Sequence, residues 1–169
     1  MTDSVVQVAD IGFWQGRQYR SFLEFNIPTG QSVVVRFTAA TDFVLKVQNL
    51  AVDSGGIRLT AYRGATSGGS WTLMPVIAKN IMGVTPVVAA KSVIETGGTV
   101  SGGTPVEIVR VVTSSSTAQA ASVGQSTGDE RGLAAGVYHI KLENLSNGAS
   151  TGVYTLIFEE RPSGTYTGI

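Results

Sequence analysis

Apolar and polar side chains alternate with a period of two along most of this chain of 169 residues. In residues 31–39, Val33, Val35 and Phe37 fall on one face, and polar side chains take most of the positions between them. Such alternation is typical of a β-strand with one face in a core and the other in water. The same pattern predicts strands at residues 42–50, 56–64, 136–144 and 152–160, with weaker candidates at 5–13, 17–26, 70–78 and 105–112.

Clusters of glycine, asparagine and proline separate these strands. Glycine and asparagine tolerate the backbone angles at which strands reverse direction, so the clusters predict turns. The turn candidates are residues 28–30, 53–56, 64–69, 97–103 and 146–148. No window has a sustained apolar stripe with the 3.6-residue period of a helix. About eight short strands joined by glycine-rich turns predict an all-β fold, either an antiparallel β-sandwich or a barrel.

The length of the chain suits a single domain. We expect an extended N-terminal arm at residues 1–16 and one β-sandwich domain at residues 17–169. Residues 113–132 are small and polar, without aromatic or β-branched runs, which predicts one long loop. This loop is either flexible on the surface or ordered by packing against a partner.

The last predicted strand is apolar on both of its faces. One face consists of Tyr154, Leu156 and Phe158. The other face contains Val153 and Ile157, although a strand with one face in water should be polar on that side. Something must therefore cover the second face: the N-terminal arm with Phe13 and Trp14, the long loop, or another subunit. The predicted partner contacts are Phe13, Trp14, Val153 and Ile157.

The charge of the chain is low and balanced. Charged residues make up 14% of the chain, against about 25% in ordinary soluble domains. Since the formal net charge is zero, nothing indicates binding to nucleic acid or to an anionic membrane. No stretch approaches the roughly 20 apolar residues of a membrane-spanning helix, and the start does not resemble a secretory signal. We expect a soluble protein made in the cytoplasm, whose low charge fits contacts between subunits.

The sequence offers little for catalysis or metal binding. The absence of cysteine excludes thiolate metal sites and cysteine nucleophiles. Residues 124–128 and 148–152 fit the pattern G-x-S-x-G, but a nucleophile elbow needs a strand–turn–helix context and a histidine that follows the serine. The only histidine, His139, precedes Ser150 and is expected to point outward as a surface residue. We therefore expect no enzyme, no metal site and no cofactor.

Four aromatic residues leave one ligand hypothesis open. Trp14, Tyr19, Tyr62 and Trp71 are candidates for a platform on which sugar rings stack, with Tyr62 and Trp71 as its main members. In the other interpretation, Trp71 packs in the core and Trp14 anchors the arm.

Two patches of the sequence resemble the jelly-roll pattern of bacterial pre-peptidase C-terminal domains. The patches are residues 27–35 with 41–45, and residues 135–140 with 152–156. In that family a G-x-Y-x-I strand pairs with a G-x-Y-x-L strand to close a sandwich. The resemblance implies a jelly-roll-like sandwich.

The whole chain resembles the small decoration or cement proteins of tailed-bacteriophage capsids. It shares with them an N-terminal arm, a cysteine-free β-sandwich rich in Gly, Ser, Thr and Val, and long small-residue loops. The resemblance implies a structural virion protein that is a homo-oligomer, a trimer or dimer, and binds the major capsid protein. Binding to the assembled shell would then stabilise it by mass action. The alternative function is a jelly-roll carbohydrate- or receptor-binding module of a phage tail or secreted protein, with the platform of Tyr62 and Trp71.

Overall fold

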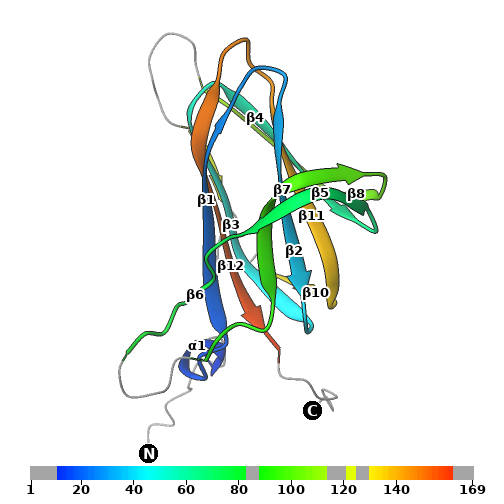
Figure 1. Cartoon of the computed structure of the whole chain (residues 1–169). Coiled ribbons are helices and arrows are strands. Elements are labelled where there is room, and N and C mark those ends of the chain that lie inside the picture. Colours follow the sequence, from blue (N-terminus) through cyan, green and yellow to red (C-terminus); the bar gives the residue numbers. More distant parts are fainter. Residues whose placement is uncertain (1–10, 83–87, 114–120, 125–129, 162–169) are drawn as a thin grey trace, which may run out of the picture.

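The computed structural model describes residues 11–82, 88–113, 121–124 and 130–161. Within these residues, twelve strands form two antiparallel sheets, preceded by one helical turn, α1 (Ile11–Trp14) (Figure 1). Sheet A contains β1 (Gln18–Ile27), β3 (Phe43–Ser54), β6 (Ile77–Ala78), β9 (Ala121–Gly124), β10 (Arg131–Leu133) and β12 (Ser150–Glu160). Sheet B contains β2 (Ser32–Ala39), β4 (Gly56–Arg63), β5 (Thr66–Leu73), β7 (Val93–Ser101), β8 (Thr104–Val112) and β11 (Gly136–Asn144). The predicted all-β sandwich is confirmed.

Most successive strands lie in different sheets, so strands far apart in the sequence become neighbours. Sheet A has the order β10–β3–β12–β1–β6, with β9 also paired to β3, and sheet B has the order β5–β7–β2–β11–β4–β8. The strands β1–β12–β3 facing β2–β11–β4–β8 follow the interleaved order of a jelly roll, and β5, β6 and β7 are inserted between β4 and β8. The first and last strands, β1 and β12, are neighbours and share one outer face.

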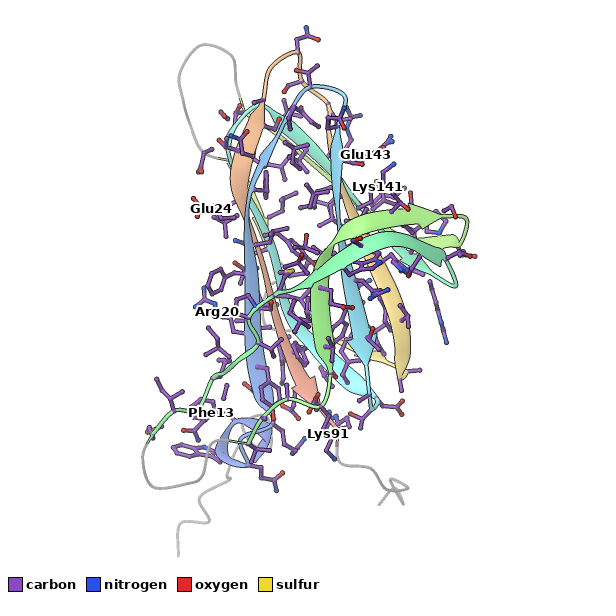
Figure 2. The ribbon with its side chains drawn as sticks, viewed as in Figure 1. Phe13, Arg20, Glu24, Lys91, Lys141 and Glu143 are labelled. Carbon is purple, nitrogen blue, oxygen red and sulfur yellow. The ribbon has the colours of Figure 1, made fainter. Side chains whose placement is uncertain are left out.

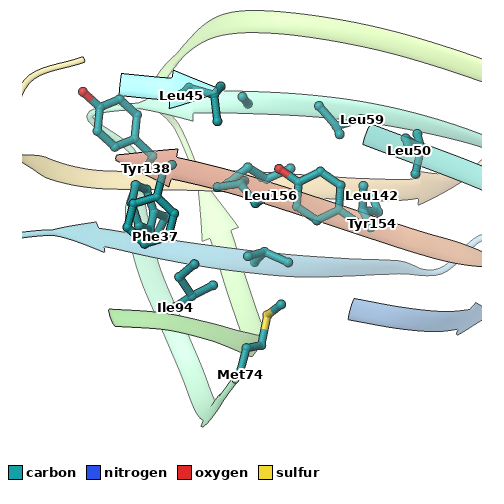
Figure 3. Close-up of a cluster of buried hydrophobic side chains, with 14 of the residues drawn as sticks. Phe37, Leu45, Leu50, Leu59, Met74, Ile94, Tyr138, Leu142, Tyr154 and Leu156 are labelled. Atoms are coloured by element: carbon teal, nitrogen blue, oxygen red, sulfur yellow. The ribbon is translucent and has the colours of Figure 1, made fainter. Parts of the chain in front are cut away.

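The core between the sheets is built from the faces that the alternation predicted. Phe158 of β12 is fully buried. Its ring centroid lies 4.9 Å from that of Phe37, 5.6 Å from that of Tyr19 and 6.4 Å from that of Phe43. Figure 3 shows side chains of the core reaching inward from both sheets. Burial of these faces fixes the strand register, because a slip of one residue would turn every core side chain outward.

Strand β7 occupies residues where the sequence predicts a turn. Gly97 and Gly98 have φ angles of +108° and +48°, which glycine adopts far more readily than other residues. They do not end the strand but lie beside a bulge in the β5–β7 pair, whose register shifts between Gly68 and Trp71. A Cβ atom on Gly98 would lie 2.3 Å from Trp71 Cε2. Glycine therefore provides close packing here, and the chain reverses later, at residues 102–103.

Two predictions about irregular segments are wrong in part. Residues 113–132 are not one loop, because β9 and β10 pair with opposite ends of β3; residues 114–120 and 125–129 lie outside the described residues. Backbone groups along the edge of a long strand favour pairing with any neighbouring segment, whatever its side chains. Of the expected extended arm, residues 11–14 form the helical turn α1, and residues 1–10 lie outside the described part of the chain.

The turn α1 is fixed against the end of β12. Gly12 packs directly on the Glu159 carboxylate, and a Cβ atom at position 12 would lie 2.0 Å from Glu159 Cδ. This carboxylate is buried and accepts hydrogen bonds from Arg17 Nη1 at 3.2 Å and Gln18 Nε2 at 2.9 Å. Lys46 Nζ lies 3.8 Å from it. The buried anion thus ties α1, β1 and β3 to the last strand.

Candidate interaction surface

The outer face of sheet A, turned away from the core, combines apolar and charged side chains. The alternation that buries one face of β1 and of β12 directs the intervening side chains outward. The strand register places these outward residues opposite one another, as the pairs Arg20–Ile157, Phe22–Thr155 and Glu24–Val153. The second apolar face of β12 is therefore continuous with an outer face of β1 that carries both apolar and charged side chains.

Strand β6 extends this face beyond β1. Ile77 pairs with Arg20 and is 46% exposed, while Phe22 is 42% exposed. Val153 and Ile157 are half-buried. A shallow hollow, the sheet-A hollow, is lined by Arg20, Phe22, Ile77, Ala78, Lys79, Val153, Thr155 and Ile157. Among the described residues, nothing covers Phe22 and Ile77, and Val153 and Ile157 are only partly covered.

Two cations border the sheet-A hollow. Arg20 forms no ion pair with another described residue; Figure 2 shows it and Glu24 pointing outward from β1. Lys79 Nζ donates a weak hydrogen bond to Gln18 Oε1 at 3.4 Å and lies 5.8 Å from the centroid of the Phe13 ring. Both cations can therefore meet an anionic group from outside the described chain.

The four predicted contact residues fall in two adjoining places. Val153 and Ile157 lie in the sheet-A hollow. Phe13 and Trp14 lie in α1, where their rings pack edge to face with centroids 5.3 Å apart. Trp14 is 61% exposed, whereas Phe13 is half-buried beside Lys79. The helical turn thus flanks the hollow through Lys79 and leaves Val153 and Ile157 uncovered.

Tyr62 and Trp71 lie on the other side of the molecule, on the outer face of sheet B. Trp71 is half-buried, with the Arg36 guanidinium 4.2 Å from its ring centroid. The His139 imidazole centroid lies 6.1 Å from the indole, and His139 pairs across the strands with Tyr62. His139 is therefore a neighbour of both aromatic residues, and Arg36 covers one face of the indole. Tyr19, the other tyrosine of the hypothesis, is buried in the core.

His139 points outward from the sandwich but is only 1% exposed, so its prediction as a surface residue is wrong. Strand β5 passes over it and brings Ser67 Oγ to 2.6 Å from His139 Nε2. Burial, with Arg36 nearby, lowers the pKa of the imidazole below its ordinary value. A serine–histidine nucleophile pair needs a third group to orient the base. Among the described residues, His139 Nδ1 has no hydrogen-bond partner, so the pair lacks the geometry of a triad.

The serine of the second G-x-S-x-G match has a structural role. Ser150 is fully buried, and its Oγ lies 2.7 Å from Asn144 Oδ1 and accepts a hydrogen bond from Gly56 N at 3.1 Å. These contacts hold the turn before β12 against the start of β4. The serine of the first match, Ser126, lies outside the described residues.

Sequence reasoning missed Phe22 and Ile77. Phe22 and Leu23 are adjacent apolar residues and so occupy both faces of β1, the same signal that the last strand carries more strongly. Ile77 reaches the hollow through a strand of only two residues, too short for any periodic pattern.

No group of three or more potential metal ligands occurs among the described residues. Within that part of the chain, no helix is long and apolar enough to cross a membrane. Comparisons with protein-family models, curated proteins and solved structures found no match to this chain. The surface must therefore be interpreted from its own geometry.

Proposed function

We propose that the protein is a structural component of an assembled protein shell, comparable to the decoration proteins of tailed-bacteriophage capsids. It binds the shell protein through the sheet-A hollow, and its action has no chemical step. The observation that carries the proposal is an apolar hollow on the outer face of sheet A, in which the half-buried Val153 and Ile157 lie beside the exposed Phe22 and Ile77.

The chemistry of the hollow specifies its occupant. Phe22 and Ile77 offer an aromatic and an aliphatic contact, and residues of this kind act as interface anchors when a partner buries them. Arg20 and Lys79 at the rim favour carboxylates. The occupant is therefore an apolar side chain of the shell protein that is flanked by Asp or Glu. Burying apolar area contributes roughly 25 cal/mol per Å², and the low charge of the chain limits the desolvation that opposes it.

The alternative, a carbohydrate-binding module, has weaker support. A sugar-stacking site needs an open aromatic face. Arg36 covers one face of Trp71, and the buried His139 adjoins that ring and pairs across the strands with Tyr62. These two aromatic residues therefore suit sugar stacking less well than the sheet-A hollow suits a protein contact.

The test is co-sedimentation of the purified full chain with empty shells of the major capsid protein encoded in the same genome. Phe22→Asp should weaken saturable binding by at least about tenfold, because it puts a charge on the anchor. Val137→Asp is the matched control, since Val137 has the same 42% exposure but lies on β11 of sheet B. Failure of the unaltered chain to bind the shells contradicts the proposal. Equal loss of binding in both variants contradicts the assignment to sheet A.

A further inference from the structure

A cavity of about 170 Å³ lies between the two sheets, where β3 and β10 of sheet A face β4, β8 and β11 of sheet B. We call it the inter-sheet cavity. Its walls are mainly apolar and include Phe37, Phe43, Leu45, Ile140 and Leu156, each 5% exposed or less. None of its lining residues belongs to the sheet-A hollow, so the two sites are separate.

One polar side chain, that of Gln48, lines the cavity among these apolar groups. Gln48 is 8% exposed, and its amide forms no hydrogen bond with another described residue. It faces inward because the register of β3 against β12 shifts near Lys46, which places Gln48 opposite Leu156. A largely buried amide is unfavourable unless water or another polar group bonds to it. The bulge therefore presents a hydrogen-bonding group to any ligand that enters the cavity.

Two further polar features lie close to the cavity. The Tyr154 hydroxyl is buried and has no partner among the described residues; Figure 3 shows it directed toward the part of the core that contains Leu156. Burial raises the pKa of this hydroxyl, so it stays protonated as a donor. Arg131 of β10 donates a hydrogen bond to Glu107 of β8. Arg131 and Glu107 both line the cavity, and their side chains are partly exposed to solvent. Their ion pair therefore joins the two sheets where the cavity opens to solvent.

We propose that the inter-sheet cavity binds a small neutral aromatic molecule that carries one hydroxyl group. The volume matches a single ring, since an apolar cavity of about 150 Å³ is known to bind benzene. The ligand is neutral because Arg131 and Glu107 compensate each other and the remaining lining carries a charge only at Arg63, which is exposed to solvent. The Gln48 amide offers both a donor and an acceptor to the hydroxyl. This site is independent of the proposed binding to a shell.

The experiment is a titration of the ¹⁵N-labelled full chain with phenol and with toluene, which has a similar shape but no hydroxyl, followed by ¹H–¹⁵N correlation spectra. Phenol should produce saturable shifts at the Gln48 side-chain amide, with a dissociation constant in about the millimolar range or tighter. Toluene should bind at least about tenfold more weakly, because it leaves the amide without a partner.

Three variants locate the site and test its polar contact. Ala61→Leu fills the cavity from β4 and should abolish the shifts, whereas Ala51→Leu, the same change on the outer face of sheet A, should retain them. Gln48→Leu should remove the preference for phenol over toluene while toluene still binds. The proposal is overturned if the folded unaltered chain shows no saturable shift with phenol, or if Ala61→Leu binds phenol as the unaltered chain does. Equal affinities of the unaltered chain for phenol and toluene would refute the assigned hydroxyl contact.

Discussion

Replacing Phe158 by Leu should destabilise the protein by more than the loss of buried apolar surface area alone would predict. The ring forms pairs with Tyr19, Phe37 and Phe43 at centroid distances of 4.9–6.4 Å. Aromatic pairs of this kind contribute about 0.5–1.5 kcal/mol each beyond area burial. Since the three pairs share one ring, and even Phe→Ala in a core costs about 3–5 kcal/mol, we expect a loss of about 2–4 kcal/mol in the free energy of unfolding.

Urea denaturation followed by far-UV circular dichroism measures this loss. With a slope of about 2 kcal/mol per M, the midpoint should fall by about 1–2 M while the slope stays unchanged. Phe22→Leu is the matched control, because the same substitution on the exposed outer face should change stability by no more than about 0.5 kcal/mol. If both variants shift the midpoint equally, or Phe158→Leu shifts it by less than about 0.3 M, the aromatic cluster does not hold the sheets together as argued.

Two further predictions concern the β5 region. Because the folded protein holds the pKa of His139 below the unfolded value of about 6.5, the unfolded chain takes up the proton more readily. The resulting contribution of His139 to stability is complete above about pH 6.5 and is lost as the pH falls through the folded pKa, with a slope of at most about 1.4 kcal/mol per pH unit. The urea midpoints at pH 7.5 and pH 5 should therefore differ less in His139→Gln than in the unaltered chain. If the difference between the two midpoints is unchanged in His139→Gln, His139 is not the source of the pH dependence. Gly98→Ala should cost about 1–3 kcal/mol through strain and displacement of Trp71, seen as a changed tryptophan emission. Gly30→Ala, also at positive φ but with nothing within 4 Å, should leave that emission unaltered.

The alternation of side chains predicts most of the sandwich because each strand carries its own two-residue signal. Strands β2, β4, β11 and β12 coincide closely with the predicted ranges. Strand β7 escapes prediction because Gly97 and Gly98 have the composition of a turn, although Gly97 packs against the backbone of β5 and Gly98 against the Trp71 ring. Strands β9 and β10 escape it because they are only four and three residues long and are recognised by their backbone pairing with β3.

The candidate surface is only partly predictable for the same reason. Val153 and Ile157 follow from a single strand that is apolar on both faces. Their union with Phe22 and Ile77 depends on which strands become neighbours, and that is a property of the topology. The burial of His139 depends on the inserted β5–β7 pair folding over sheet B, which no pattern within 136–144 indicates.

The pairing of β1 with β12 also decides how the molecule responds to mechanical force. The start of β1 and the end of β12 lie side by side, with Gln18 opposite Glu159. A force that separates these two ends would break the hydrogen bonds between β1 and β12 one after another, because it loads one hydrogen bond at a time. A force parallel to the strands would instead shear β1 against β12, so all the hydrogen bonds between the two strands would share the load. The fold should therefore resist force weakly when Gln18 and Glu159 are pulled apart, and strongly when the force acts parallel to β1 and β12.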